Sequence, residues 1–190
     1  MKGTVLYEVN DGVAVLTVDN PPVNPLSDGV RNGLYESLQK AEDDNSVKGV
    51  VLTGNGRAFI AGADISEFGG NVEGKSLNEV FQKLEFCKKP VVAAINGIAL
   101  GGGLETALCC NYRIIDKNAI VGLPEVNLGL LPGGGGTQRL PRLAGPSEAL
   151  KMMLTGSHVP AQKALNLGIV DSISDNIVAE SIEFIKDVAE

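Results

Sequence analysis

The chain has 190 residues, of which 44% are hydrophobic and 21% charged, which is ordinary for one globular domain with a full hydrophobic core. Its formal net charge of -7 and the lack of any Lys and Arg cluster argue against a nucleic-acid partner. No apolar run is long enough to span a bilayer and no signal-peptide core opens the chain, so we expect no membrane partner and an intracellular location, cytoplasmic or, in a eukaryote, peroxisomal.

The cysteines and the histidine exclude further classes of protein. Three cysteines, two of them the adjacent pair Cys109 and Cys110, make a poor disulfide framework, so we expect reduced, structural thiols. With His158 as the one histidine and no CxxC spacing, we expect no metal site. His158 follows Thr-Gly-Ser and is interpreted as a surface loop residue.

The first half of the chain alternates expected strands with expected helices. Asn10-Asp11-Gly12 lies between two strand-like segments and predicts an opening hairpin. Apolar positions at helical spacing predict one helix from Ser27 to about residue 43 and another around 77–84. The expected strands lie at residues 5–9, 13–18, 50–53, 59–64 and 91–95.

The second half continues the same alternation. The expected helices follow the glycines at 101–103 as far as about Tyr112, and then lie at 137–143, 147–154, 161–167 and within 176–190. The expected strands lie at 113–115, 120–122 and 169–173. This order predicts an α/β domain over residues 1–190, with a mainly parallel sheet covered by helices. The last helix has an apolar side that needs a partner, which we expect to be another chain or sequence beyond Glu190.

Two glutamates stand between apolar neighbours. Glu105 follows Gly101-Gly102-Gly103-Leu104, and Glu125 follows Gly122-Leu123-Pro124. Apolar surroundings disfavour the charged carboxylate, which raises its pKa toward the range used in acid-base chemistry. Taken singly, Glu105 is better explained as a charge at a helix start and Glu125 as an exposed turn residue, but together they form a candidate acid-base pair.

Glycine runs beside these glutamates suggest an anion site made by the main chain. A helix that opens at glycines presents N–H groups without side chains in the way, and Gly102 is well placed for this. The small residues after Phe59 could bring a second N–H group to the site. A tight turn packed on a neighbouring strand explains that segment equally well.

Three motifs in order resemble the enoyl-CoA hydratase/isomerase (crotonase) family over nearly the whole chain. They are Phe59-Ile60-Ala61-Gly62-Ala63-Asp64-Ile65, the segment from Ile95 to Glu105, and the segment from Gly122 through Pro124-Glu125 to Leu140. The resemblance implies a spiral of strand-strand-helix turns with two nearly perpendicular sheets and helices outside. It implies an acyl-CoA substrate, with coenzyme A as part of that substrate and no separate cofactor.

The resemblance also implies roles for particular residues. The oxyanion hole maps onto the N–H groups of Ala61 and Gly102, and the substrate-binding main chain adds Gly62, Ala63 and Asp64. Glu105 and Glu125 match the two catalytic glutamates of the family's hydratases. Because many relatives with other chemistry lack one of the pair, hydration of trans-2-enoyl-CoA in fatty acid β-oxidation is favoured. The alternatives are an enoyl-CoA isomerase and a catalytically silent acyl-CoA-binding module.

The sequence of residues 122–133, with Asn20-Pro21-Pro22-Val23-Asn24 upstream, is most similar to the N-terminal part of bifunctional enzymes that join a hydratase to a 3-hydroxyacyl-CoA dehydrogenase. Family members continue past the position of Glu190 into helices that cover the acyl site. We therefore expect a core domain truncated before those helices. It would either form a homo-oligomer or continue into a dehydrogenase domain, which would hold any NAD.

Two segments of the chain partly resemble nucleotide-binding patterns. Residues 69–76, Gly-Gly-Asn-Val-Glu-Gly-Lys-Ser, match the P-loop pattern by letter, but no buried strand precedes them and Glu73 would face the phosphates, so a surface loop is favoured. Neither glycine run completes the GxGxxG pattern of a dinucleotide site.

Overall fold

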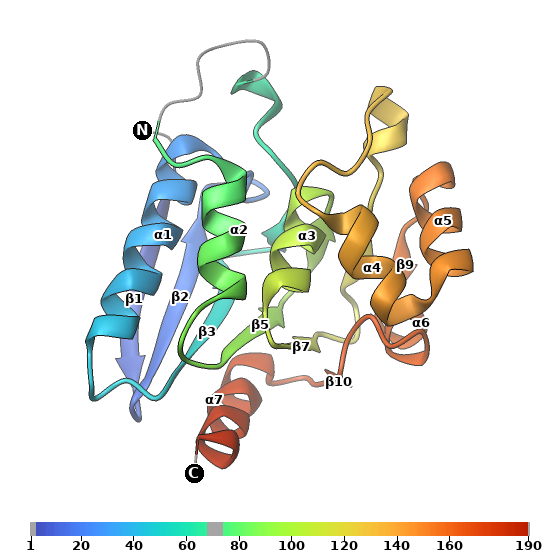
Figure 1. Cartoon of the computed structure of the whole chain (residues 1–190). Coiled ribbons are helices and arrows are strands. Elements are labelled where there is room, and N and C mark those ends of the chain that lie inside the picture. Colours follow the sequence, from blue (N-terminus) through green and yellow to red (C-terminus); the bar gives the residue numbers. More distant parts are fainter. Residues whose placement is uncertain (1–2, 68–73, 190) are drawn as a thin grey trace.

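The computed structural model describes residues 3–67 and 74–189, and in this part of the chain the strands form two sheets (Figure 1). The first sheet contains, in spatial order, β1 (Thr4–Asn10), β2 (Val13–Asp19), β3 (Gly49–Gly54), β5 (Val91–Ile95), β7 (Tyr112–Ile115) and β10 (Ser172–Ile173). The hairpin strands β1 and β2 are antiparallel, and the other neighbours are parallel. This confirms the predicted hairpin and the mainly parallel sheet.

The second sheet contains, in spatial order, β4 (Ala58–Ile60), β6 (Ile98–Leu100), β8 (Ile120–Gly122) and β9 (Val159–Pro160). The first three strands run parallel, and β9 pairs antiparallel with β8. Successive turns of the chain place one strand in the first sheet, the next strand in the second sheet, and then a helix. This is the repeated strand-strand-helix spiral that the family resemblance implies.

Helices cover the first sheet on both faces (Figure 1). The helices are α1 (Asp28–Asp43), α2 (Leu77–Glu85), α3 (Gly102–Cys109), α4 (Gly136–Ala144), α5 (Pro146–Thr155), α6 (Ala161–Asn166) and α7 (Ile177–Val188), with short 3-10 turns at η1 (Ile65–Glu67) and η2 (Glu125–Leu128). The main hydrophobic core lies between the sheets and α1 to α6. None of the helices in the described ranges is long and apolar enough to cross a membrane.

Helix α7 packs on the opposite face of the first sheet. Its buried side chains Ile177 and Ile185 join a second apolar cluster with residues of β2, β3, β5 and β7. The alternating strand residues of a sheet point to opposite faces, so the strands present one apolar set to α1 and another to α7. The expectation that another chain or further sequence covers α7 is therefore wrong, because this chain's own sheet covers it.

Two predicted boundaries are also corrected. The helix after the glycine triplet ends at Cys109, and Tyr112 begins β7, where it pairs with Val92 of β5. The last strand covers Ser172–Ile173 alone, since Ile169 and Val170 lie in a buried bend before it. In both places pairing with a distant strand decides where the element begins.

The second sheet positions the loops from which the site is built. In parallel strands the carboxyl ends lie at the same edge of the sheet. The ends of β4, β6 and β8 are in register, with Ile60 opposite Ala99 and Leu100 opposite Gly122. The residues that follow these strands, 61–63, 101–102 and 123–125, therefore emerge side by side.

Candidate active site

A cavity of about 300 Å³ lies at this edge of the second sheet. Most of its lining is main chain or apolar side chain, and it contains two ionisable groups, Glu105 and Glu125. The other lining residues are Ala61, Gly62, Ala63, Leu77, Gly101, Gly102, Pro124, Leu128, Leu130, Leu131, Gly133 and Gly134. The three loops after β4, β6 and β8 thus meet the glycine-rich loop before α4 around one apolar space.

Glu105 lies in the first turn of α3 and is only 3% exposed. Its Oε1 atom accepts hydrogen bonds from the N–H groups of Gly134 and Gly136, both at 2.8 Å. Burial raises the pKa of Glu105 above its ordinary value, while these two N–H groups and the charge of Arg139 act in the opposite direction. Because Oε1 accepts two N–H bonds and carries no proton, a proton taken up by Glu105 would be on Oε2.

Glu125 follows β8 at the start of η2 and is half-buried. Its Oε2 atom is buried and has no hydrogen-bond partner among the described residues. Burial, followed by the charge of Glu105, raises the pKa of Glu125, and a hydrogen bond to its own backbone opposes this in part. A carboxyl group next to a second carboxylate in an apolar cavity keeps its proton more readily, so Glu125 suits the protonated form.

The close approach of α3 to the second sheet depends on glycine. A Cβ atom on Gly103 would lie 1.8 Å from the carbonyl oxygen of Ile60, so no other residue fits between α3 and β4. Gly101, before the helix, has φ +54, a conformation that side chains disfavour. This packing brings the N-terminus of α3 against the loop after β4.

Peptide orientation decides which N–H groups face the cavity. The N–H of Ala61 donates to the carbonyl of Val23 at 3.1 Å. The expectation that Ala61 supplies an oxyanion N–H group is therefore corrected, because that N–H already has an acceptor. Ala61 lines the cavity by other atoms.

Two other N–H groups are turned outward. The carbonyl of Gly62 accepts from Leu26 N–H at 2.9 Å, and the carbonyl of Gly101 accepts from Glu105 N–H at 3.0 Å. The C=O and N–H of a trans peptide point in opposite directions, so the N–H of Ala63 points away from Leu26 and that of Gly102 points out of the helix end. The N atom of Ala63 lies 3.4 Å from where a Cβ on Gly102 would be, so the two groups are neighbours.

Comparison with known protein families identifies the family of this chain. The model of the family described as enoyl-CoA hydratase/isomerase matches residues 8–190. The chain belongs to this family. The resemblance of its three motifs is thereby confirmed.

The relatives include proteins named as bifunctional enzymes and a protein named as a probable enoyl-CoA hydratase. The chain is 49% identical to a peroxisomal bifunctional enzyme of Danio rerio over 94% of its own length but 25% of that protein's. It is 45% identical to a probable enoyl-CoA hydratase of Bacillus subtilis, covering 95% of this chain and 72% of that one. A crystal structure of an enoyl-CoA hydratase from Bacillus anthracis superposes with a TM-score of 0.91 at 34% identity, covering 98% of this chain and 76% of that one.

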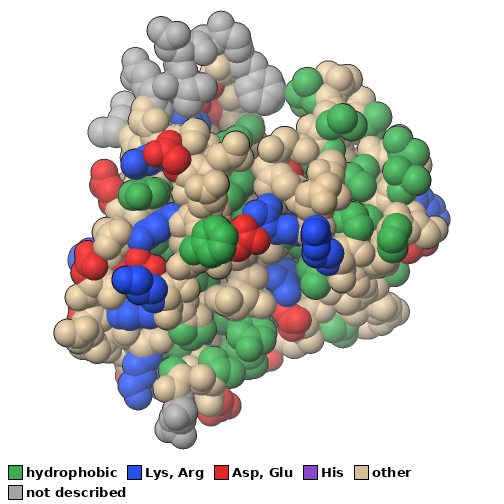
Figure 2. Space-filling model, viewed as in Figure 1, with side chains coloured by type: hydrophobic (Ala, Val, Ile, Leu, Met, Phe, Trp, Pro, Cys, Tyr) green, Lys and Arg blue, Asp and Glu red, His purple; other side chains and the backbone are tan. Residues whose placement is uncertain are grey.

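The cavity has an apolar mouth on one side. Leu128 and Leu131 line the cavity and remain largely exposed, Leu131 at 77%. Figure 2 shows hydrophobic side chains gathered over η2 and α5, the region to which these residues and the exposed Leu150 and Leu154 of α5 belong. An apolar rim of this kind suits an acyl group entering the cavity.

Asp64 lies outside this cavity. It lines a neighbouring pocket of about 280 Å³ together with Arg31, Glu67 and Ser76. This pocket shares Ala63, Leu77 and Gly133 with the first cavity. The Asp64 Oδ1 atom accepts from the N–H and hydroxyl of Ser66 at 3.0 and 2.6 Å. The predicted substrate-binding set therefore divides between two adjoining pockets.

The predicted P-loop pattern falls partly on residues 69–73, which are outside the described residues. Its last residue, Ser76, is the N-cap of α2 and forms a capping box with Glu79. Lys75 Nζ pairs with the same glutamate at 3.1 Å. The described part of the pattern thus begins a helix with its polar groups paired locally.

Sequence reasoning assigned no role to Gly134, Gly136 or Arg139, which all act on Glu105. The signal was present, since all three belong to the motif that carries the family resemblance. The contact itself could not be predicted from the sequence, because Gly134 is 29 residues from Glu105.

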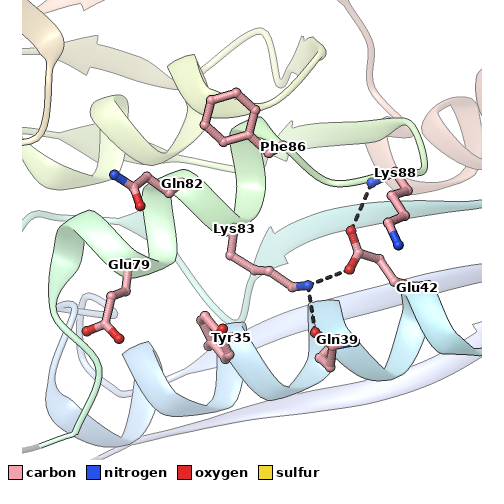
Figure 3. Close-up of a pocket in the computed structure, with 8 residues that line it drawn as sticks. All are labelled: Tyr35, Gln39, Glu42, Glu79, Gln82, Lys83, Phe86 and Lys88. Atoms are coloured by element: carbon pink, nitrogen blue, oxygen red, sulfur yellow. Dashed lines mark hydrogen bonds and ion pairs between the residues drawn. The ribbon is translucent and has the colours of Figure 1, made fainter.

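A third pocket, between α1 and α2, is lined mainly by polar and charged side chains (Figure 3). Lys83 points into it and bonds Glu42 and the side-chain oxygen of Gln39, the latter at 2.8 Å. Glu42 also accepts the backbone N–H of Lys88 at 2.9 Å. The polar groups at its centre are paired with one another, so this pocket is not the candidate active site.

Proposed function

We propose that this chain carries enoyl-CoA hydratase activity, adding water across the 2,3 double bond of trans-2-enoyl-CoA to give 3-hydroxyacyl-CoA in fatty acid β-oxidation. The observation that carries the proposal is the meeting of Glu105 and Glu125 with two outward N–H groups around one apolar cavity. Relatives named as hydratases and as bifunctional enzymes support it.

The thioester carbonyl would lie against the N–H groups of Ala63 and Gly102. Attack on C3 moves charge onto the carbonyl oxygen as an enolate forms, and two N–H donors in an apolar cavity stabilise that charge. Removing one such donor from an oxyanion hole costs roughly 10²–10³ in kcat. The pair proposed here replaces the Ala61 and Gly102 pair expected from the sequence.

The two glutamates would divide the proton transfers. Glu105, whose Oε1 accepts two N–H bonds, would act as the ionised base that takes a proton from water as its oxygen attacks C3. Glu125, whose Oε2 has no partner among the described residues, would carry the proton delivered to C2. One water is consumed, with its hydroxyl at C3 and a hydrogen at C2.

The reaction so proposed needs no cofactor, since coenzyme A is part of the substrate. Relatives named as bifunctional enzymes are compatible with a further domain. If the protein continues into a dehydrogenase domain, NAD would bind there. A homo-oligomer is the other arrangement that we retain. Relatives are named peroxisomal or glyoxysomal. We retain a peroxisomal location in a eukaryote and a cytoplasmic one otherwise.

The test is to mix the protein with crotonyl-CoA and follow the loss of the conjugated enoyl thioester absorbance, identifying the product by chromatography. Glu105→Gln and Glu125→Gln should each slow hydration by about 10²–10⁴-fold, the usual worth of a general acid or base. A parallel assay with a 3-enoyl-CoA tests isomerisation. Binding of acyl-CoA without either reaction would sink the hydratase proposal and leave an acyl-CoA-binding module.

A further inference from the structure

We infer that Arg139 is a positioning residue for hydration, because its guanidinium joins α2 to the loop at residues 133–136 whose N–H groups hold Glu105. The inference rests on the proposed role of Glu105. Arg139 does not line the cavity, so it would act through the loop and not on the substrate.

The guanidinium is held by α2. Arg139 Nε and Nη2 donate to the two carboxylate oxygens of Glu85, at 3.2 and 2.7 Å. This is a bidentate pair, which fixes the plane of the guanidinium as well as its position. The side chain of Arg139 is 21% exposed, so the pair is partly shielded from water.

The remaining nitrogen reaches the glycine loop. Arg139 Nη1 donates to the carbonyl of Gly134 at 2.7 Å. A Cβ atom on Gly135 would lie 2.2 Å from the same nitrogen, so the guanidinium lies directly against the main chain of the loop. Gly135 has φ +91, which leaves this close approach to glycine.

The same loop residues hold the catalytic carboxylate. The N–H of Gly134 and the N–H of Gly136 meet at Oε1 of Glu105. A continuous set of contacts therefore runs from Glu85 through Arg139 and Gly134 to Glu105. The peptide between Gly134 and Gly135, whose carbonyl bonds Arg139, lies between the two peptides whose N–H groups bond Glu105. Without the guanidinium this middle peptide loses the donor that fixes its carbonyl, and the directions of the N–H groups on either side of it are less firmly determined.

The positive charge of Arg139 also affects Glu105, in addition to the contacts through the loop. The ionisable groups around Glu105 are Arg139 of α4, Glu85 of α2, Cys109 of α3 and Glu125 of η2. Burial raises the pKa of Cys109 to about 12, so its thiol is neutral. Arg139 is thus the positive charge that opposes the effect of burial on the pKa of Glu105. Its loss should raise that pKa further, and a base with a raised pKa stays protonated to a higher pH.

The experiment compares Arg139→Gln, Arg139→Lys and Arg142→Gln in crotonyl-CoA hydration between pH 5 and 9, with thermal unfolding of each. Arg142 is the matched control, since it lies one turn along α4, is exposed and bonds only the carbonyl of Gln138 among its hydrogen bonds in the described residues. Arg139→Gln should lower kcat by about ten- to a hundredfold, as misplacement of a catalytic group does, with little change in KM. The acid limb of the pH–rate profile of Arg139→Gln should move to higher pH.

Arg139→Lys keeps the charge but not the planar fork, so it should lose kcat while its acid limb stays near that of the wild type. Arg142→Gln should match the wild type. A folded Arg139→Gln protein with wild-type kcat and an unmoved acid limb would overturn the inference.

A readout independent of activity separates this inference from the proposed function. Hydrogen exchange at the Gly134 and Gly136 amides, followed by NMR, should be faster in Arg139→Gln than in the wild type or Arg142→Gln. If the wild type does not hydrate crotonyl-CoA, the proposed function fails whatever the exchange result. If exchange at these two amides is unchanged in Arg139→Gln, the positioning role fails even in an active enzyme.

Discussion

The cavity of the candidate site and the pocket between α1 and α2 each contain a carboxylate that is almost fully buried. The side chain of Glu42 is 7% exposed, and Glu105 as a residue is 3% exposed. Burial would raise the pKa of both, but the hydrogen bonds from Lys83 and from the Lys88 N–H lower the pKa of Glu42, whereas Glu105 keeps a raised pKa. The difference lies in the partner, a lysine ammonium for Glu42 and backbone N–H groups for Glu105.

This comparison shows that burial of a carboxylate does not by itself mark a catalytic group. A buried carboxylate paired with a cation is stabilised in its charged form and contributes to the fold. A buried carboxylate held by glycine amides beside a second, unpaired carboxyl group can exchange a proton. The predictions below separate the two cases, beginning with the largest effect.

A side chain added to the glycine loop at residues 133–136 should disturb the hydrogen bonds that hold Glu105. In Gly134→Ala the new Cβ would lie 2.1 Å from Cε2 of Phe81 and 2.6 Å from Oε2 of Glu105. We expect hydration of crotonyl-CoA to fall by about a hundredfold and stability by about 1–3 kcal/mol from overpacking. Rates and urea unfolding measure the two effects.

The neighbouring glycine provides the control for stability. A Cβ on Gly133 would meet nothing within 4 Å. Gly133→Ala should therefore unfold like the wild type. A Gly134→Ala protein as stable and active as the wild type would show that the loop tolerates a side chain and does not determine the position of Glu105.

Breaking the ion pair between α1 and α2 should affect the fold and not the reaction. Glu42→Gln leaves the Lys83 ammonium, 15% exposed, without its carboxylate. The loss of a charge-assisted hydrogen bond there should cost about 1–3 kcal/mol in urea unfolding, with the hydration rate unchanged. Adding Lys83→Met should recover part of the loss. A fall in hydration rate without a fall in stability would contradict this separation.

The two carboxylates should give opposite pH dependence of stability, which is the smallest of these effects. The lowered pKa of Glu42 means that its contribution is present above the unfolded value of about 4.3 and is lost as the pH falls through the folded pKa. The raised pKa of Glu105 means that the stability of its protonated form is lost as the pH rises through the folded pKa.

Measured by urea unfolding from about pH 2.5 to about pH 8, the wild-type protein should gain stability relative to Glu42→Gln as the pH rises from the acid end to the unfolded pKa of about 4.3. Relative to Glu105→Gln it should lose stability as the pH rises from that value through the folded pKa of Glu105. The same slope in both comparisons would mean that the two carboxylates do not differ in the way their partners indicate.

Local features of the chain were predictable from the sequence. The helices at α1 and α2 follow from apolar residues at helical spacing, and the hairpin of β1 and β2 follows from Asn10-Asp11-Gly12. Glu105, Glu125 and Gly102 were identified because carboxylates and glycines in apolar sequence are uncommon, and all three line the cavity. These signals reside in neighbouring residues, so no knowledge of the fold was needed to detect them.

Other features depended on contacts between distant residues. Whether Ala61 or Ala63 turns its N–H toward the cavity depends on pairing with residues 23–26, which orients the intervening peptides. The partner of α7 is the far face of the first sheet, and the partner of Arg139 is Glu85, 54 residues away. The sequence by itself identified Glu105 and Glu125, the two residues for which we propose acid-base roles. The tertiary structure decided which peptide N–H groups and charges face them. The direction of an N–H group is set by the hydrogen bond that the carbonyl of the same peptide accepts from a distant residue.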